Sequence, residues 1–468
     1  MKGDYYNMNE ENKKYLKWYQ KLGYGQGDFG ANCFYVFVTN FVLIYLTDTV
    51  GLNAGIIGTL ILVSKCFDGI SDVIFGKMID KTNHKLGKAR PWILFSTLPI
   101  AIFEVLMFTV PSGLSQGMQY VYFFIIYTAS NAIFYTANNI SYATLMALIT
   151  KNKNERVQIT SYRYIFAMIA NIIISAVSMG MVNAFGGGVS GWRTTSLIFA
   201  VLQIFSNIIL VLSAKEIPEN TKNEGDEQKT ETIKENDKLS DSFGNTLKAV
   251  MTNKYYILML TNTILGYISQ GIMGALGIYY CTYVLGNSAL LGVLSMAQLA
   301  MAIGLLGTPA VVRKMGIYRA VTVFFAISAG FSVLAAVAGF RSSFLLLVVA
   351  IALKYLTFAP SSGCSNPLIA EIATNVYLKK NIHAEGVIFS CSSVGIKVGG
   401  GLASAISGWA LVAVRYNASL DQQTQFTLNG ITAVYLLVPA IISIISAIII
   451  RQIKVIQENQ KLMEKSKI

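Results

Sequence analysis

Long apolar runs follow one another along almost the whole chain. Only 13% of the 468 residues are charged, whereas about a quarter are charged in a typical soluble domain. A helix needs about 20 mostly apolar residues to cross a bilayer, where it satisfies its own backbone hydrogen bonds. The sequence therefore predicts an all-α membrane protein with twelve transmembrane helices, at residues 28–47, 54–79, 91–110, 119–148, 159–184, 193–213, 256–284, 289–312, 320–340, 344–369, 386–413 and 428–450.

Lysine and arginine are concentrated in every second loop between the predicted helices. The alternate loops hold only Arg193, Arg341 and Arg415. Because cytoplasmic loops of membrane proteins carry this excess of basic residues, we expect both termini on the cytoplasmic side of the plasma membrane. The net charge of +13 is then a topology signal, and no nucleic-acid partner is expected.

One long polar stretch, residues 215–247, divides the predicted helices into two groups of six. We expect this stretch and the tail to be solvated linkers. A weak repeat supports two related halves, because K-x-G-x-x-R follows the second helix of each half, at 85–90 and 314–319. Paired bundles with a substrate site at their interface are a common transporter plan. The predicted organisation is an N-terminal segment at 1–27, six-helix bundles at 28–213 and 255–450, a middle loop at 214–254 and a tail at 451–468.

Three charged residues lie inside the second apolar run. Lys65, Asp68 and Asp72 are spaced i, i+3 and i+7, so they share one face of a helix. A charge at bilayer depth costs at least about 2.5–3.5 kcal/mol. Carboxylates that can pair with a lysine, a proton or a metal cation are what an ion-coupled carrier needs. The alternative interpretation is a structural salt bridge or the cytoplasmic end of the helix.

Amide, aromatic and basic side chains also occur inside other predicted helices. Amides donate and accept hydrogen bonds, and charges strengthen them, so the set suits a neutral solute rich in hydroxyl groups. Amides in membrane helices also pack helix against helix, which is the alternative interpretation. A buried charge needs a partner, which favours function at the two basic positions. The residues are Asn32, Tyr35, Asn138, Asn139, Tyr142, Arg163 and Lys397.

Motifs of membrane-embedded enzymes do not occur in the sequence. It has no HExxH, GxSxG or P-loop motif, and its only histidines are His84 and His383. We therefore expect no enzymatic activity, no catalytic residue and no cofactor.

Short motifs recur in a fixed order over roughly residues 20–455. The more specific combination is Asp68-x-x-x-Asp72 followed by Arg-Pro-Trp-x-Leu at 90–94. With the stretches at 21–30, 45–52, 67–72, 87–94, 139–142 and 396–399, it resembles the glycoside–pentoside–hexuronide:cation symporters, the melibiose-carrier branch of the major facilitator superfamily. The resemblance implies twelve helices in two bundles, alternating access, and uptake of a glycoside, pentoside or hexuronide driven by a cation gradient.

The resemblance also implies a cation site. In that family the carboxylates of the second helix bind the cation, and the matching residues are Asp68 and Asp72, where H⁺ or Na⁺ is expected. Lys65 stands where a basic residue is usual, and Lys397 matches a lysine that links the cation and sugar sites. Basic loops after the second and eighth helices are expected to close the cytoplasmic side through ion pairs with helix ends, by way of Asp80, Arg90, Lys314 and Arg319.

Sugar-contacting positions of the family match Asn32 and Asn139, with Tyr35, Tyr142 and Arg163 nearby. The melibiose carrier has aspartates at the two asparagine positions, so galactoside recognition of its kind is not expected here. The loss of these carboxylates could also favour H⁺ over Na⁺. The alternatives left open are a lipid-like or other non-sugar carrier of the same superfamily and a transport-inactive sugar sensor. The expected partners are a small sugar, a monovalent cation and membrane lipid, and the expected state is a monomer.

Overall fold

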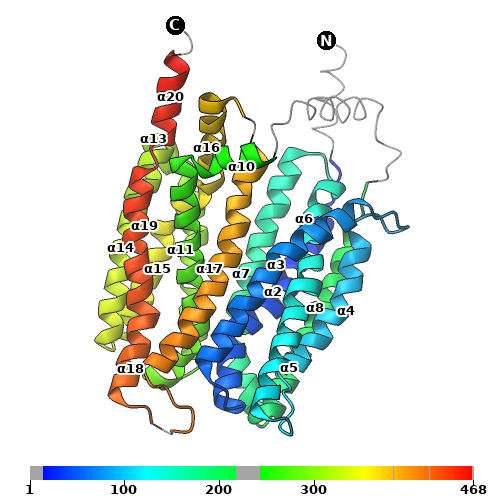
Figure 1. The fold of residues 1–468 in the computed structure, drawn as a ribbon, viewed down its shortest axis with the longest axis vertical. Helices are drawn as coiled ribbons and strands as arrows, with labels where there is room; N and C mark the ends of the chain where they lie inside the picture. The colour runs from blue at the N-terminus through cyan, green and yellow to red at the C-terminus, as the bar shows by residue number, and fades with distance from the viewer. Residues whose placement is uncertain (1–13, 218–242, 383, 421, 466–468) are drawn as a thin grey trace. The chain divides into compact units, whose positions relative to one another are not determined.

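The structure is a computed structural model that describes residues 14–217, 243–382, 384–420 and 422–465. The described residues form α-helices joined by loops, with π-helical segments in several of the long helices (Figure 1). Contacts group the chain into two compact units. Unit 1 combines Met1–Thr221, Gly274–Ser295 and Ser407–Gln423, and unit 2 combines Lys222–Met273, Met296–Ile406 and Thr424–Ile468.

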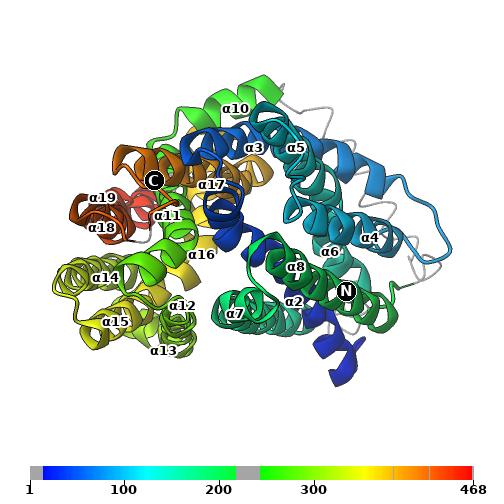
Figure 2. The same cartoon turned by 90° about the horizontal axis from the view of Figure 1, so that it is seen from below.

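The helices that lie in unit 1 are α2 (Trp18–Ile44), η1 (Tyr45–Thr49), α3 (Ala54–Asp80), α4 (Arg90–Met107), α5 (Gln116–Thr128), η2 (Ala129–Tyr135), α6 (Thr136–Ile149), α7 (Lys153–Ala184), α8 (Gly188–Ser213), η5 (Tyr280–Val284) and most of α12 (Leu290–Met296). Helix α2 packs against α7 and α8, and α4 packs against α8 and α6, as the view along the helices shows (Figure 2). Aromatic rings fill this core, with Phe108 4.4 Å from Phe37 and 5.7 Å from Trp192 between ring centroids.

The helices that lie wholly or mostly in unit 2 are α10 (Phe243–Met251), α11 (Lys254–Tyr279), α13 (Leu299–Met315), α14 (Ile317–Phe340), α15 (Phe344–Gly363), α16 (Ser365–Lys380), α17 (Glu385–Ala413), α18 (Gln425–Thr432), η6 (Ala433–Leu437), α19 (Val438–Gln452) and α20 (Val455–Lys465). Helix α14 packs against α15 and α19. The predicted span at 344–369 is interrupted, because α15 ends at Gly363 and α16 begins at Ser365.

Eleven helical stretches among the described residues are long and apolar enough to cross a membrane. The predicted span at 119–148 is not one of them, although the chain is helical without interruption from Gln116 to Ile149. This stretch is less apolar because it carries Asn131, Asn138, Asn139 and Ser141. The described residues therefore form a helical architecture with eleven candidate membrane spans, and a twelfth span stays a prediction.

Two local structures repeat between the halves of the sequence. In both K-x-G-x-x-R motifs the glycine has a positive φ, 105° at Gly87 and 77° at Gly316, just before a helix begins. A second repeat becomes apparent from the backbone conformation. Tyr45-x-Thr-x-x-x-Gly51 and Tyr280-x-Thr-x-x-x-Gly286 each form a π-helical turn followed by a glycine of positive φ. The two matches strengthen the case for related halves.

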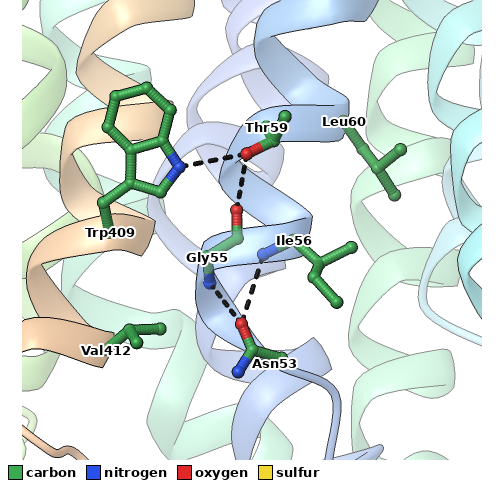
Figure 3. A pocket seen from close by; sticks show the side chains of 7 residues that line it. All are labelled: Asn53, Gly55, Ile56, Thr59, Leu60, Trp409 and Val412. Carbon is green, nitrogen blue, oxygen red and sulfur yellow. Dashed lines mark hydrogen bonds between the residues drawn. The ribbon is translucent and has the colours of Figure 1, made fainter.

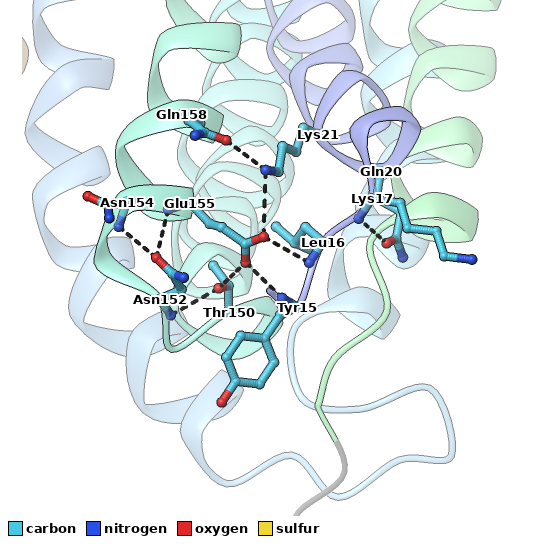
Figure 4. Close-up of polar contacts among 10 residues, drawn as sticks. All are labelled: Tyr15, Leu16, Lys17, Gln20, Lys21, Thr150, Asn152, Asn154, Glu155 and Gln158. Carbon is cyan, nitrogen blue, oxygen red and sulfur yellow. Dashed lines mark hydrogen bonds and ion pairs between the residues drawn. The ribbon is translucent and has the colours of Figure 1, made fainter. Parts of the chain in front are cut away.

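Helix α2 begins ten residues before the predicted first span. Glu155 anchors the chain there by accepting hydrogen bonds from the backbone N–H groups of Tyr15 and Leu16, both at 3.1 Å, and from Thr150 at 2.7 Å (Figure 4). Lys21 adds an ion pair at 3.5 Å. The polar start of α2 is therefore held by tertiary contacts that an apolar window does not detect.

The predicted solvated tail is instead a packed helix, so that expectation was wrong. Asn459 of α20 is 2% exposed, and its amide donates to the carbonyl and carboxylate of Glu371 at 2.8 Å. The Asn375 amide donates to Asn459 at 2.8 Å, and Val455 is fully buried. These contacts join α20 to α16 within unit 2. Most of the predicted middle linker, residues 218–242, lies outside the described residues.

Candidate functional site

The charged stripe of α3 is present in the structure. The Lys65 ammonium lies 2.9 Å from the Asp68 carboxylate, and Asp68 is only 6% exposed. Asp72 follows one turn later and is half-buried. The Lys65 nitrogen also lies 5.9 Å from the centre of the Tyr127 ring of α5. A buried carboxylate beside an ammonium can exchange that partner for a proton or a metal cation, because each balances the same charge.

One face of α2 carries Asp28, Asn32 and Tyr35, spaced i, i+4 and i+7. The Asn32 amide donates to the backbone carbonyl of Asp28 at 2.7 Å, and Asn32 is half-buried. Tyr35 is 38% exposed, and its ring stacks on Tyr135 with 6.0 Å between centroids. This face therefore offers an amide and an aromatic surface one or two turns from a carboxylate.

Arg163 of α7 is held by Asp28. Its Nε lies 2.6 Å from the Asp28 Oδ2 atom, and the guanidinium carbon lies 4.5 Å from the centre of the Tyr142 ring. The Tyr142 hydroxyl donates to the Tyr24 carbonyl at 2.7 Å and to Asp28 Oδ2 at 3.3 Å. We name Asp28, Asn32, Tyr142 and Arg163 the Asp28 cluster. It joins α2, α6 and α7 through charge-assisted and cation–π contacts.

A glycine makes this approach of α2 and α6 possible. A Cβ atom on Gly27 would lie 2.6 Å from the Tyr142 ring and 2.8 Å from Leu210. The ring of Tyr142 also stacks on Tyr24, with 4.7 Å between centroids. The orientation of Tyr142 toward Asp28 therefore depends on the missing side chain at residue 27.

The two neighbouring asparagines of α6 have different surroundings. Asn138 is 3% exposed and its amide donates to the Ser96 hydroxyl at 3.0 Å, so it packs α6 against α4. Asn139 is exposed and lies on the helix face of Tyr135 and Tyr142, four residues after the first and three before the second. The sequence left both interpretations open for each residue. The structure favours helix packing for Asn138 and a surface role for Asn139.

Lys397 lies in unit 2, on α17, and is half-buried. The glycines on either side pack closely on α11. A Cβ atom on Gly399 would lie 2.6 Å from the Tyr267 side chain, and one on Gly395 would overlap Thr263. Small residues thus bring these helices together around Lys397. Its predicted association with the α3 carboxylates stays a prediction.

The predicted gating residues lie at helix ends. Asp80 is the last residue of α3 and is exposed, as are Lys314 and Arg319 in unit 2. Arg90 begins α4, and its side chain lies 3.9 Å from Glu216. The Glu216 carboxylate also accepts hydrogen bonds from the backbone N–H groups of residues 88, 89 and 90, at 2.7, 3.0 and 3.1 Å. Glu216 therefore caps the positive end of α4, a role the sequence did not reveal.

A second polar cluster lies at the other end of α2. Asp48 accepts hydrogen bonds from Thr47 and Tyr283, both at 2.6 Å, and from Tyr416 at 2.7 Å. Thr47 also contacts the Tyr279 hydroxyl at 2.7 Å. We name Thr47, Asp48, Tyr279, Tyr283 and Tyr416 the Asp48 cluster. Burial, followed by the Asp48 charge, raises the pKa of Tyr416, so its hydroxyl keeps its proton and remains a donor.

A cavity of about 370 Å³ opens beside the first turns of α3 (Figure 3). Trp409 donates to the Thr59 hydroxyl at 3.0 Å, and Asn53 caps the helix by accepting from the backbone of Gly55 at 2.9 Å. The residues that line the cavity are mostly apolar, and none of those described there is charged. The charged residues of α3 begin further along the helix, at Lys65. This cavity is therefore a weaker candidate for sugar recognition than the charged face of α3 or the face of α2 that carries Asp28, Asn32 and Tyr35.

The sequence missed the central role of Asp28. The residue lies inside the stretch 21–30 that supported the family resemblance, and one turn before Asn32. That spacing was a usable signal. Its partner, Arg163, is 135 residues away in the chain, so the ion pair itself could not be predicted from local spacing in the sequence. Tyr127 and Tyr135, the aromatic neighbours of Lys65 and Tyr35, were missed for the same reason.

Residues 23–456 match the sequence profile of the family described as MFS/sugar transport protein. The chain belongs to this family. It is 26% identical to the isoprimeverose transporter of Lactiplantibacillus pentosus, covering 96% of this chain and 91% of that one. It is 25% identical to the putative glycoside/cation symporter YagG of Escherichia coli (strain K12), covering 90% and 88%. The predicted glycoside-type symporter branch of the major facilitator superfamily is thus confirmed.

The fold is also similar to solved transporters. The inward-open xylose transporter XylE from E. coli aligns with a TM-score of 0.61 at 13% identity, over 93% of this chain and 95% of that one. The nucleoside transporter NupG aligns with a TM-score of 0.59 at 16% identity, over 93% and 98%. This sugar transport family member is a multi-pass membrane transporter and not an enzyme.

Proposed function

We propose that this protein is a secondary active symporter that couples H⁺ or Na⁺ to the uptake of a glycoside, pentoside or hexuronide across the plasma membrane. The observation that carries the proposal is the buried Lys65–Asp68 pair, with Asp72 one turn away, in the same unit as the Asp28 cluster. Ion-exchangeable carboxylates and a polar, aromatic-lined set of side chains are the two parts that such a carrier needs. The names of two relatives, an isoprimeverose transporter and a putative glycoside/cation symporter, support a sugar substrate and a coupling cation.

In the proposed cycle a cation from outside binds at Asp68 and Asp72 and replaces Lys65 as the partner of Asp68. Sugar hydroxyls then bind Asn139 and the Asp28 cluster, which includes Asn32, and a sugar ring stacks on an aromatic face such as Tyr35. Binding of each ligand raises the affinity for the other by the same factor. Lys397 pairs with the carboxylates when no cation is present.

The proposed arrangement is alternating access by two six-helix bundles, at 28–213 and 255–450, with twelve spans and both termini in the cytoplasm. Asp80, Arg90, Lys314 and Arg319 contribute to closing the cytoplasmic side. The Asp48 cluster closes the opposite ends of the helices and opens when the site faces outward. A monomer is sufficient, because every proposed ligand contact comes from a single chain.

The test is uptake of radiolabelled sugars by vesicles that contain the protein, over a panel of glycosides, pentosides and uronides. A pH gradient and a Na⁺ gradient are imposed separately. We expect one gradient to stimulate uptake, and Asp72→Asn to remove that stimulation. An uptake rate that neither gradient changes would contradict coupling and indicate a facilitator. Binding without uptake would indicate a sensor, and no interaction with any sugar would favour a non-sugar carrier.

The two asparagines of α6 allow a matched comparison. We expect Asn139→Ala to raise the KM for sugar about tenfold or more while the protein keeps its thermal stability, because an exposed amide is removed from the proposed sugar face. Asn138→Ala should leave KM nearly unchanged and lower stability by about 1–3 kcal/mol, because it removes the buried partner of Ser96. Transport kinetics and thermal unfolding in detergent measure both. The opposite assignment of the two effects would contradict this interpretation.

A further inference from the structure

We propose that Asp28 sets the charge selectivity of the sugar site: by occupying Arg163, it restricts the site to uncharged sugars and excludes uronides and other anionic sugars. This inference rests on the proposed function and deepens it. The juxtaposition that carries it is a resident carboxylate bound to the one arginine of the Asp28 cluster.

The ion pair uses the part of Arg163 that would recognise an anionic substrate. Asp28 Oδ2 lies 2.6 Å from Nε and Oδ1 lies 3.5 Å from Nη2, so the Asp28 carboxylate faces one edge of the guanidinium. Arginine binds carboxylates through such paired N–H groups. The Tyr142 ring lies against the guanidinium at 4.5 Å. A substrate carboxylate would therefore have to displace Asp28 to reach this edge.

The pair is also sheltered from solvent. The side chains of Arg163 and Asp28 are 23% and 16% exposed. Partial burial reduces screening, so the pair is stronger than a surface ion pair. The Tyr142 hydroxyl, which donates to both Asp28 Oδ2 and the Tyr24 carbonyl, fixes the orientation of the carboxylate.

The basic side chains on the described polar faces of unit 1 support the same conclusion. Lys65 and Arg163 each have a carboxylate partner, Asp68 and Asp28. An anionic sugar would have to compete with Asp68 or Asp28 for these two cations, whereas hydroxyl groups can bind Asn32 and the Tyr142 oxygen without that cost.

The experiment is competition against a labelled neutral glycoside in equilibrium exchange, which does not require an ion gradient. The competitors are methyl β-D-glucoside, methyl β-D-xyloside and methyl β-D-glucuronide, of which the glucoside and glucuronide differ only at C6. The wild type should bind the better neutral glycoside at least tenfold more tightly than the glucuronide. Asp28→Asn should reduce this preference about tenfold or reverse it, because it leaves Arg163 free for the uronide carboxylate.

Two further variants separate this role from a general charge effect. Glu155→Gln also removes one negative charge from unit 1, outside the proposed sugar and cation sites, and should leave the preference within about twofold. The double variant Asp28→Asn, Arg163→Gln should lose the gain in glucuronide binding, because that gain requires the guanidinium. It also lacks an unpaired charge, so it serves as a folded comparison if Asp28→Asn alone is unstable.

Each outcome decides between the proposals. Equal binding of glucoside and glucuronide by the wild type, or an unchanged preference in Asp28→Asn, overturns the role of Asp28 while leaving sugar transport intact. An equal shift in Glu155→Gln also overturns it in favour of overall charge. Failure of every sugar to compete overturns the proposed function itself.

Discussion

Asp68→Asn is expected to abolish gradient-driven accumulation of sugar while sparing exchange of sugar across the membrane. The change keeps the shape of the side chain and removes the buried charge that pairs with Lys65 at 2.9 Å. Without this carboxylate, Asp72 alone remains to bind the coupling cation, and the buried charge that the cation neutralises at residue 68 is gone. The proposed sugar contacts on α2, α6 and α7 are untouched, so we expect the bundles still to carry bound sugar in both directions.

Accumulation in vesicles under the stimulating gradient measures the first part, and counterflow of labelled sugar measures the second. We expect accumulation to fall at least about a hundredfold, because the buried carboxylate that we propose for coupling is lost, whereas counterflow should stay within about tenfold. Ser71→Ala is the matched control. Its hydroxyl donates to the Asp68 backbone carbonyl at 3.0 Å, so it changes the same turn of α3 without removing a charge. Wild-type accumulation by Asp68→Asn would contradict the assignment of Asp68 to the cation site.

The α3 stripe shows what the sequence can predict about this site. Lys65, Asp68 and Asp72 lie within one helix, so helical periodicity alone places them on one face. The apolar runs predicted the helices for a similar reason. The weak Gly87 and Gly316 repeat could also be recognised, because each glycine is fixed by its local backbone conformation.

The Asp28 cluster shows where prediction from the sequence ends. Asp28 and Arg163 meet because α2 packs on α7, and local spacing contains no information on that contact. The same limit applies to Asn138 and Asn139, which are adjacent and chemically identical but differ in burial. Helix α20 was misjudged because its few apolar residues, such as Val455, pack on a surface that only the folded chain provides.

The last prediction concerns the Asp48 cluster, which joins residues from three distant segments of the chain within unit 1. Asp48→Ala should make this end of the helices open more often. The change removes the acceptor of two tyrosine hydroxyls, Tyr283 and Tyr416. Hydrogen bonds to a charged group each contribute about 1.5–3 kcal/mol, so losing them favours opening by about tenfold or more.

Cys281 is a native probe of that opening, because it lies in η5 between Tyr279 and Tyr283 and is fully buried. In a chain that keeps it as the sole cysteine, we expect Asp48→Ala to increase its labelling by a membrane-impermeant maleimide about tenfold or more. Tyr416→Phe removes only one donor, so a smaller increase is expected, with little change in volume. Equal labelling rates in wild type and Asp48→Ala, with both proteins folded, would mean that the cluster does not limit access to this end. A graded increase would instead identify its hydrogen bonds as the contacts that must break when the transporter opens there.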